Sequence, residues 1–151
     1  MPIRIILADD YPPYTESLRD MLARAGDIDV IDTVTDGRRA VEAARAKSPD
    51  VVVMDVRMAE LNGIEATRRI RAELPSVSVL ALSTYPDRTM VTQMLRAGAT
   101  GYLLKDCAGE ELVDAIRAVA GGSTYLCAQV ADTFAPTDLD QILRNPKSGR
   151  S

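Results

Sequence analysis

Five short apolar runs, rich in β-branched residues, alternate along this chain with segments of helical period. The runs are IRIILA (3–8), IDVIDTV (28–34), VVVMD (51–55), VSVLALS (77–83) and TGYLLK (100–105). Glycine or proline separates the periodic segments at Gly26, Pro49, Pro75 and Gly98. Because strands that alternate with helices form right-handed βαβ units, this pattern predicts a parallel sheet that is covered on both faces.

The predicted fold is α/β. The first, third and fourth runs are almost continuous Val, Ile and Leu, which is typical of strands buried on both faces of a sheet. We expect a flavodoxin-like (βα)5 fold, a doubly wound five-stranded parallel sheet in the order 2-1-3-4-5, over residues 1–121. A chain of 151 residues is long enough to bury one self-sufficient core.

The C-terminal stretch follows a different pattern. Leu126, Val130 and Phe134 recur at every fourth position and predict one further short helix within residues 122–135. Residues 136–151 have the composition of a tether, for which two interpretations stay open. One is a linker toward an absent effector domain, and the other is a frayed terminus. We favour the linker.

Composition excludes several classes of function. The chain contains no histidine, which removes Ser-His-Asp and Cys-His catalysis and most zinc sites. Its net charge of −4 argues against nucleic-acid binding by this chain alone. Cys107 and Cys127 do not make a disulfide framework and are expected to be packing residues. The sequence has no apolar stretch of membrane-spanning length and no signal-peptide pattern, so we expect a cytoplasmic protein.

Charged and hydroxyl side chains follow four of the apolar runs at the point where each run ends. They are Asp9 and Asp10 after the first run, Asp55 at the third, Ser83 at the fourth and Lys105 at the fifth. The carboxyl ends of parallel strands share one edge of the sheet, and the order 2-1-3-4-5 makes these four ends neighbours. Three carboxylates, a hydroxyl and an ammonium are therefore predicted to share one pocket.

This set of side chains suits phosphoryl chemistry. Three aspartates with one lysine are short of positive charge, and oxygen-only ligands favour Mg²⁺, which commonly takes one or two carboxylates plus a phosphate oxygen. Asp55 is then the expected nucleophile, while Asp9 and Asp10 would hold the metal. Lys105 would neutralise phosphate oxygens, and Ser83 would donate a hydrogen bond to them.

A known family carries the same residues. The segments LADD, VVVMDVRM, LNGIEATRRIR, VLALST and AGATGYLLKD occur in the order and spacing of the receiver domain of two-component response regulators. The chain resembles that domain over residues 2–121, and GYLLKD is most similar to the NarL/FixJ (LuxR-type) subfamily. The resemblance implies that Asp55 is the phosphoacceptor and that Asp9 and Asp10 are metal-site residues. It further implies that the backbone carbonyl of Arg57 completes the metal ligands.

The resemblance also implies a switching mechanism. Ser83 is the expected switch hydroxyl, Tyr102 the switch aromatic and Lys105 the phosphate-binding lysine. A separate sensor histidine kinase would donate the phosphoryl group; Ser83 would move toward it, and Tyr102 would rotate into the vacated space. The expected output is homodimerisation or the release of an attached helix-turn-helix domain, which this chain lacks and through which alone it would bind DNA. We expect no enzymatic activity beyond the chain's own phosphoryl transfer and dephosphorylation.

Three rival interpretations can be weighed from the same residues. A flavodoxin-type electron carrier shares the strand order but needs aromatic residues beside the flavin, and this chain has one Phe and no Trp. A metal-dependent aspartyl-phosphate phosphohydrolase would use the same aspartates and Mg²⁺, but it usually carries a cap domain for which there is little room. A phosphorylation-independent pseudo-receiver is disfavoured by the presence of Asp55, Ser83 and Lys105 together.

Overall fold

A parallel sheet of six strands lies at the centre of the part of the protein that the computed structural model describes, residues 2–58, 62–133 and 142. The strands are β1 (Ile3–Ala8), β2 (Ile28–Val34), β3 (Val51–Asp55), β4 (Ser78–Ser83), β5 (Gly101–Leu104) and β6 (Tyr125–Leu126). Their order in the sheet is β2-β1-β3-β4-β5-β6, and every neighbouring pair is parallel. The predicted order 2-1-3-4-5 is therefore confirmed, with one strand added beside β5.

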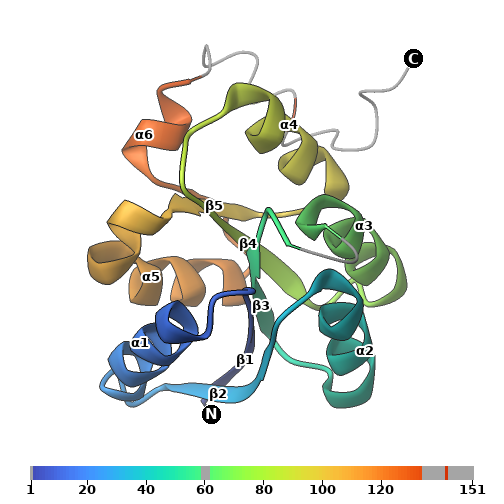
Figure 1. Cartoon of the computed structure of the whole chain (residues 1–151), viewed down its shortest axis with the longest axis vertical. Helices are drawn as coiled ribbons and strands as arrows, with labels where there is room; N and C mark the ends of the chain where they lie inside the picture. The colour runs from blue at the N-terminus through green and yellow to red at the C-terminus, as the bar shows by residue number, and fades with distance from the viewer. Residues whose placement is uncertain (1, 59–61, 134–141, 143–151) are drawn as a thin grey trace.

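Helices cover both faces of this sheet. They are α1 (Pro12–Ala23), α2 (Gly37–Lys47), α3 (Gly63–Glu73), α4 (Arg88–Ala97), α5 (Lys105–Ala120) and α6 (Ala128–Ala131). Figure 1 shows α1 and α5 on one side of the sheet, and α2, α3 and α4 on the other. This arrangement confirms the doubly wound α/β fold. Within the described residues, the helices are too short or too polar to cross a membrane.

The central strands are buried from end to end. Every residue of β3 and β5 is buried, and so is β1 from Ile5 onward. By contrast β2, at the edge of the sheet, is mostly half-buried, in agreement with the aspartates at positions 29 and 32 of its sequence. Burial on both faces explains why the runs at β1, β3 and β4 are almost continuously apolar.

Local caps set where several helices begin. The side chains of Asp36, Asn62 and Asp87 accept hydrogen bonds from backbone N–H groups in the first turns of α2, α3 and α4. Helix α5 has no such side-chain cap, because it begins at Lys105 directly after Leu104, the last residue of β5. The end of β5 therefore fixes the position of Lys105.

The predicted short C-terminal helix is present as α6, but a short strand that the sequence did not indicate precedes it. Leu126 belongs to the short strand β6, and the helix that follows, α6, has only four residues. The backbone N–H of Tyr125 donates to the carbonyl of Thr100, and that of Cys127 donates to the carbonyl of Tyr102. These bonds extend the sheet beyond β5. A strand of two residues is too short to produce a period-2 pattern, so the spacing of Leu126 did not reveal β6.

Other predictions for the C-terminal stretch stay untested. Phe134 and the tether predicted at 136–151 lie outside the described residues, with the exception of Ile142, which is buried. The proposed domain boundaries after residues 121 and 135 also stay predictions.

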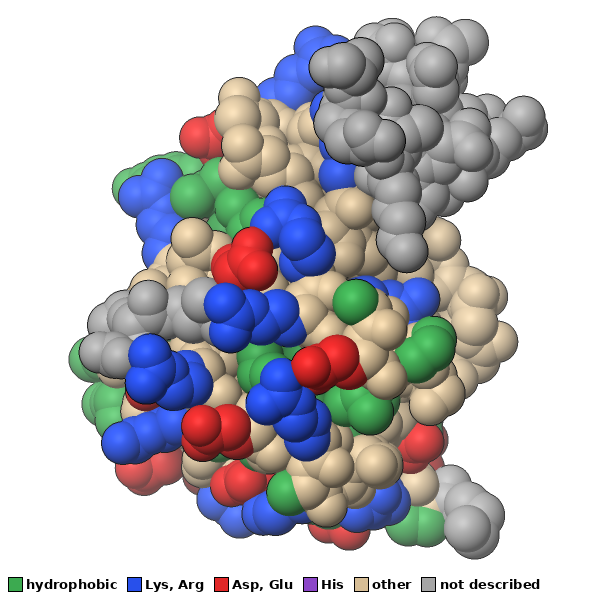
Figure 2. All heavy atoms as spheres, turned by 90° about the vertical axis from the view of Figure 1, so that its right-hand side faces the viewer, with side chains coloured by type: hydrophobic (Ala, Val, Ile, Leu, Met, Phe, Trp, Pro, Cys, Tyr) green, Lys and Arg blue, Asp and Glu red, His purple; other side chains and the backbone are tan. Residues whose placement is uncertain are grey.

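Charged side chains of both signs cover the outer face of α2 and α3. Figure 2 shows Lys and Arg side chains interspersed with Asp and Glu over this side of the molecule. Arg45 of α2 forms two hydrogen bonds with Glu73 of α3, and Glu65 pairs with both Arg68 and Arg69. Exposed pairs of this kind contribute little to stability individually, so this face is an ordinary solvated surface.

Gly63 stands where helix α3 approaches the end of β3. Its N–H donates to the carbonyl of Val56. A Cβ at this position would overlap the backbone oxygen of Asp55 and would lie 2.9 Å from the Cα of Val56. Both obstacles are backbone atoms that cannot swing aside, so any larger residue would push α3 away from the segment that carries Asp55.

We expect Gly63→Ala to lower the free energy of unfolding by about 2–3 kcal/mol, because the added methyl group overpacks the backbone. The matched control is Gly109→Ala in α5, where a Cβ meets nothing within 4 Å. That substitution should raise the free energy of unfolding by about 0.5–1 kcal/mol through helix propensity. Urea denaturation of the three proteins measures both effects. Equal effects of the two substitutions would contradict the close approach at Gly63.

Candidate functional site

Five of the side chains singled out from the sequence lie at the carboxyl edge of the sheet. Asp9 and Asp10 directly follow β1, Asp55 closes β3, Ser83 closes β4, and Lys105 follows β5. These four strands are consecutive neighbours in the sheet. The fold therefore brings together residues that are up to 96 positions apart in the sequence.

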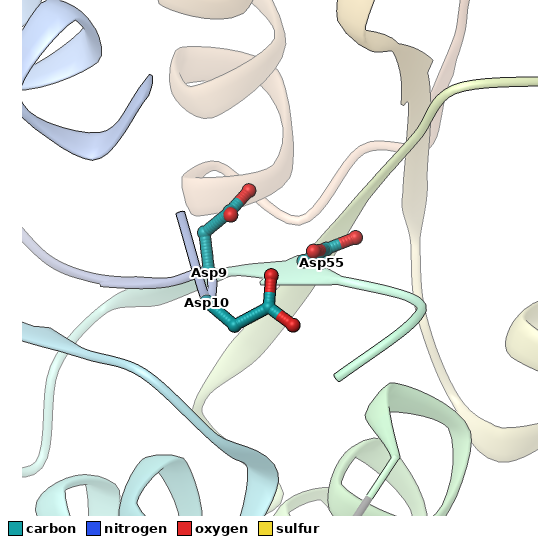
Figure 3. Close-up of side chains that lie close together, drawn as sticks. All are labelled: Asp9, Asp10 and Asp55. Atoms are coloured by element: carbon teal, nitrogen blue, oxygen red, sulfur yellow. The ribbon is translucent and has the colours of Figure 1, made fainter. Parts of the chain in front are cut away.

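Three carboxylates form an acidic cluster at this edge. One oxygen from each of Asp9, Asp10 and Asp55 lies within 4.8 Å of the others. Figure 3 shows Asp9 and Asp10 at the end of β1, with Asp55 beside them at the end of β3. Asp9 and Asp55 are only 4% and 6% exposed, whereas Asp10 is exposed. Charges this close together near the interior repel one another strongly unless a cation compensates them.

Lys105 provides part of that compensation. Its Nζ atom lies 2.8 Å from Oδ2 of Asp9 and 3.6 Å from Oδ2 of Asp55. Burial alone would lower the pKa of Lys105, but the hydrogen bond to Asp9 and the charges of Asp55 and Asp9 outweigh burial and raise that pKa above its ordinary value. Lys105 is therefore charged. One ammonium against three carboxylates still leaves the cluster negative, and its oxygen donors are those that Mg²⁺ prefers.

Asp55 is the carboxylate most affected by this environment. Burial raises its pKa from 3.8 to about 6, the charge of Asp9 adds to the increase, and Lys105 opposes it. The backbone N–H of Arg57 donates to Oδ1 of Asp55 over 3.3 Å. Asp9, in contrast, accepts from the N–H of Tyr11 at 2.9 Å and from Lys105 at 2.8 Å. Asp55 therefore has longer polar contacts than Asp9, since its second oxygen, Oδ2, lies 3.6 Å from Nζ of Lys105.

A pocket of about 440 Å³ opens beside Asp55. Its lining residues are Asp55, Arg57, Ser83, Thr84, Tyr85, Asp87, Met90 and Lys105. The carboxylate of Asp55, the Ser83 hydroxyl and the Lys105 ammonium thus border the same space. Arg57 is part of the wall, whereas its predicted role as a carbonyl ligand of a metal stays a prediction.

Ser83 and Tyr102 contact each other directly. The Tyr102 hydroxyl donates to Oγ of Ser83 at 3.0 Å, and Ser83 donates to the carbonyl of Tyr85 at 2.9 Å. The Tyr102 side chain is fully buried, and burial raises its pKa, so it remains a neutral donor. The Tyr102 ring is already buried in this structure, and its predicted rotation upon phosphorylation stays a prediction.

Tyr14 is a site residue that the sequence interpretation missed. Its ring centroid lies 4.8 Å from Nζ of Lys105. Burial raises the pKa of Tyr14 well above its ordinary value, and the carboxylates of Asp9 and Asp55 add to the increase. One signal was present in the sequence: Tyr14 precedes Leu18 by four positions, which puts it on the buried face of α1.

The sequence of this chain matches the response regulator receiver domain family over residues 5–117. It is 41% identical over 124 residues to the transcriptional regulatory protein LnrK of Bacillus subtilis, which covers 82% of this chain and 56% of LnrK. It is also 38% identical over 128 residues to the transcriptional regulatory protein DegU of Brevibacillus brevis, covering 85% of this chain and 54% of DegU. The chain thus spans about half the length of these curated relatives.

Comparison with solved structures agrees with the family match. A two-component response regulator of the LuxR family from Aurantimonas sp. superimposes with a TM-score of 0.86 at 31% sequence identity. The superposition covers 92% of this chain and 99% of that one. The agreement therefore extends over nearly the whole of both chains.

The raised pKa of Asp55 predicts how stability depends on pH. The pKa of Asp55 is about 6 in the folded protein, whereas an aspartate in the unfolded chain has a pKa of about 3.9. The folded protein therefore binds a proton at Asp55 more tightly than the unfolded chain does. Stability from this group therefore falls as pH rises from 4 to 6 in metal-free buffer, and the loss is complete above the folded pKa. We expect Asp55→Asn to raise the free energy of unfolding by about 1–3 kcal/mol at pH 7.5, with the gain shrinking toward zero at pH 4.

Urea denaturation in EDTA at both pH values measures this effect. The control is Asp20→Asn on the exposed side of α1, which should change stability by no more than about 0.5 kcal/mol at either pH. A stability gain for Asp55→Asn that is equal at pH 4 and pH 7.5 would contradict the raised pKa.

Proposed function

The chain belongs to the response regulator receiver domain family, and on that premise we propose that it is a phosphorylation-activated signalling switch. Asp55 accepts the phosphoryl group, and a sensor histidine kinase donates it. The observation that carries this proposal is the buried carboxylate of Asp55, which borders an open pocket and lies 3.6 Å from the Lys105 ammonium.

The transfer is a displacement at phosphorus. An oxygen of the Asp55 carboxylate attacks the phosphorus of a phosphohistidine; the new P–O bond forms as the P–N bond breaks, and the released imidazole nitrogen takes up a proton. This chain contains no histidine, so the phosphohistidine must lie outside it. Because the pKa of Asp55 is about 6, most of this carboxylate is ionised and nucleophilic at pH 7.

Mg²⁺ is the cofactor that fits the acidic cluster. Asp9, Asp10 and Asp55 would hold the ion, with the backbone carbonyl of Arg57 as a further ligand. The oxygen-only donor set and the excess of carboxylates over the single ammonium support this choice. When bound, the ion neutralises charge on the phosphoryl oxygens.

Lys105 and Ser83 contact the oxygens of the phosphoryl group once it is on Asp55. Lys105 is paired with Asp9 at 2.8 Å, and we propose that it exchanges part of this contact for a phosphoryl oxygen. Ser83 donates to the carbonyl of Tyr85, so it must give up that bond in order to donate to the phosphoryl group. The exchange also loosens the bond from Tyr102, which carries the change to β5.

The output of the switch follows from the relatives as a proposal. LnrK and DegU are named transcriptional regulatory proteins, and this chain covers about half of each. We propose that phosphorylation shifts the population toward a homodimer and controls a helix-turn-helix domain, through which alone DNA is contacted. The cytoplasm, where sensor kinases present their phosphohistidine, is the proposed compartment.

Receiver domains of response regulators are generally not enzymes. We propose that catalysis by this chain is limited to its own phosphorylation and dephosphorylation. A metal-dependent phosphohydrolase would turn over phosphate esters repeatedly with the same aspartates, and a pseudo-receiver would work without phosphorylation. The match to the receiver family supports the receiver over the phosphohydrolase, and Lys105 beside Asp55 at an open pocket supports it over the pseudo-receiver.

Incubation with acetyl phosphate and MgCl₂, followed by intact-mass measurement, tests the proposal. We expect one phosphoryl group per chain, none with Asp55→Asn, and none when EDTA replaces MgCl₂, because both the nucleophile and the cation are required. Asp20→Asn should be phosphorylated like the unsubstituted protein. A phosphoryl adduct that persists in Asp55→Asn would show that another residue is the acceptor. Repeated hydrolysis of phosphate esters would favour the phosphohydrolase.

A further inference from the structure

We propose that Tyr14 is a positioning residue for phosphoryl transfer, and that its aromatic ring holds the Lys105 ammonium in place between Asp9 and Asp55. This inference rests on the proposed function, because the task of Lys105 is to meet the phosphoryl group.

The ammonium of Lys105 has two kinds of partner. The carboxylates of Asp9 and Asp55 lie 2.8 Å and 3.6 Å from it. The ammonium also lies over the face of the Tyr14 ring, whose centroid is 4.8 Å from Nζ. A cation at this distance from an aromatic face is attracted by the negative charge of the ring face. The Lys105 side chain is 23% exposed and so has access to solvent, and the ring adds an attraction that keeps its ammonium in the site.

The ring, and not the hydroxyl, makes this contact. The phenol oxygen of Tyr14 is buried and has no hydrogen-bond partner among the described residues. The backbone holds the ring in place: Tyr14 lies in the first turn of α1, where its N–H donates to the carbonyl of Tyr11. Leu18, one turn further along, is buried in the core and anchors the same face of the helix.

Holding Lys105 in place matters because its side chain is long and flexible. A lysine that is free to leave the pocket must lose side-chain conformational freedom when the phosphoryl group arrives. A lysine that is already confined between two carboxylates and a ring has lost most of that freedom beforehand, which favours transfer. Removal of the ring should therefore slow phosphorylation without removing the charge of Lys105 or the nucleophile.

Four proteins test this inference: the unsubstituted chain, Tyr14→Phe, Tyr14→Leu and Tyr11→Leu. The last is a matched control, because Tyr11 precedes the same helix but is 61% exposed. We expect the initial rate of phosphorylation by acetyl phosphate in saturating MgCl₂ to fall about three- to ten-fold in Tyr14→Leu. The rates of Tyr14→Phe and Tyr11→Leu should stay within about two-fold of the unsubstituted chain.

A second readout does not depend on phosphorylation. The Lys105 ε-methylene group is bonded to the Nζ atom that lies over the ring, so we expect its proton NMR signals to be shifted upfield in the unsubstituted chain and in Tyr14→Phe. The shift should disappear in Tyr14→Leu. If Tyr14 had a purely structural role, Tyr14→Phe and Tyr14→Leu would both be less stable, but the upfield shift would not be lost in Tyr14→Leu alone.

The outcomes separate this inference from the proposed function. An unchanged rate in Tyr14→Leu, a faster rate, or an equal loss in Tyr14→Phe would overturn the role of the ring. If the unsubstituted chain forms no phosphoryl adduct, the proposed function fails. The NMR comparison then decides alone: an upfield shift that survives in Tyr14→Leu overturns the contact, and one that is lost only in that variant supports it.

Discussion

The ion pair of Lys105 with Asp9 and Asp55 is the interaction on which the functional edge of this protein depends. Two nearly buried carboxylates at the ends of neighbouring strands repel each other, and such repulsion is weakly screened away from bulk water. The ammonium, 2.8 Å from one and 3.6 Å from the other, compensates this repulsion. It does so incompletely, since the pKa of Asp55 remains raised to about 6. The residual negative charge makes the site receptive to a cation.

The fold holds this arrangement through the way its elements join. Helix α5 starts at the residue that follows β5, so the backbone of Lys105 is fixed by the sheet on one side and by the helix on the other. Asp55 is the last residue of β3, and Gly63 lets α3 pack closely against the turn that follows it. Burial of Asp55 costs stability at neutral pH, as is common for groups whose perturbed pKa serves a function.

The strand order and the residues at the carboxyl edge of the sheet could be predicted from the sequence. Continuous apolar runs indicate strands buried on both faces, and four of the five runs are closed or directly followed by a polar residue where the structure has the end of a strand. Other features of the structure have no recognisable pattern in the sequence. The strand β6 is two residues long and arises because β5 offers a free edge. The inward position of Tyr102 and the contact of Tyr14 with Lys105 depend on side-chain packing across elements, which periodicity within one element does not report.

The most direct test of the switch is to compare ¹H–¹⁵N NMR spectra before and after phosphorylation, in the unsubstituted chain and in Ser83→Ala. Because Ser83 links the pocket to Tyr102 through a hydrogen bond of 3.0 Å, shifts in the unsubstituted chain should reach from Asp55 to Tyr102 and along β5. In Ser83→Ala the adduct should still form, but the shifts should stay near Asp55. Equally widespread shifts in both proteins would contradict the coupling of the phosphoryl group to Tyr102 through Ser83.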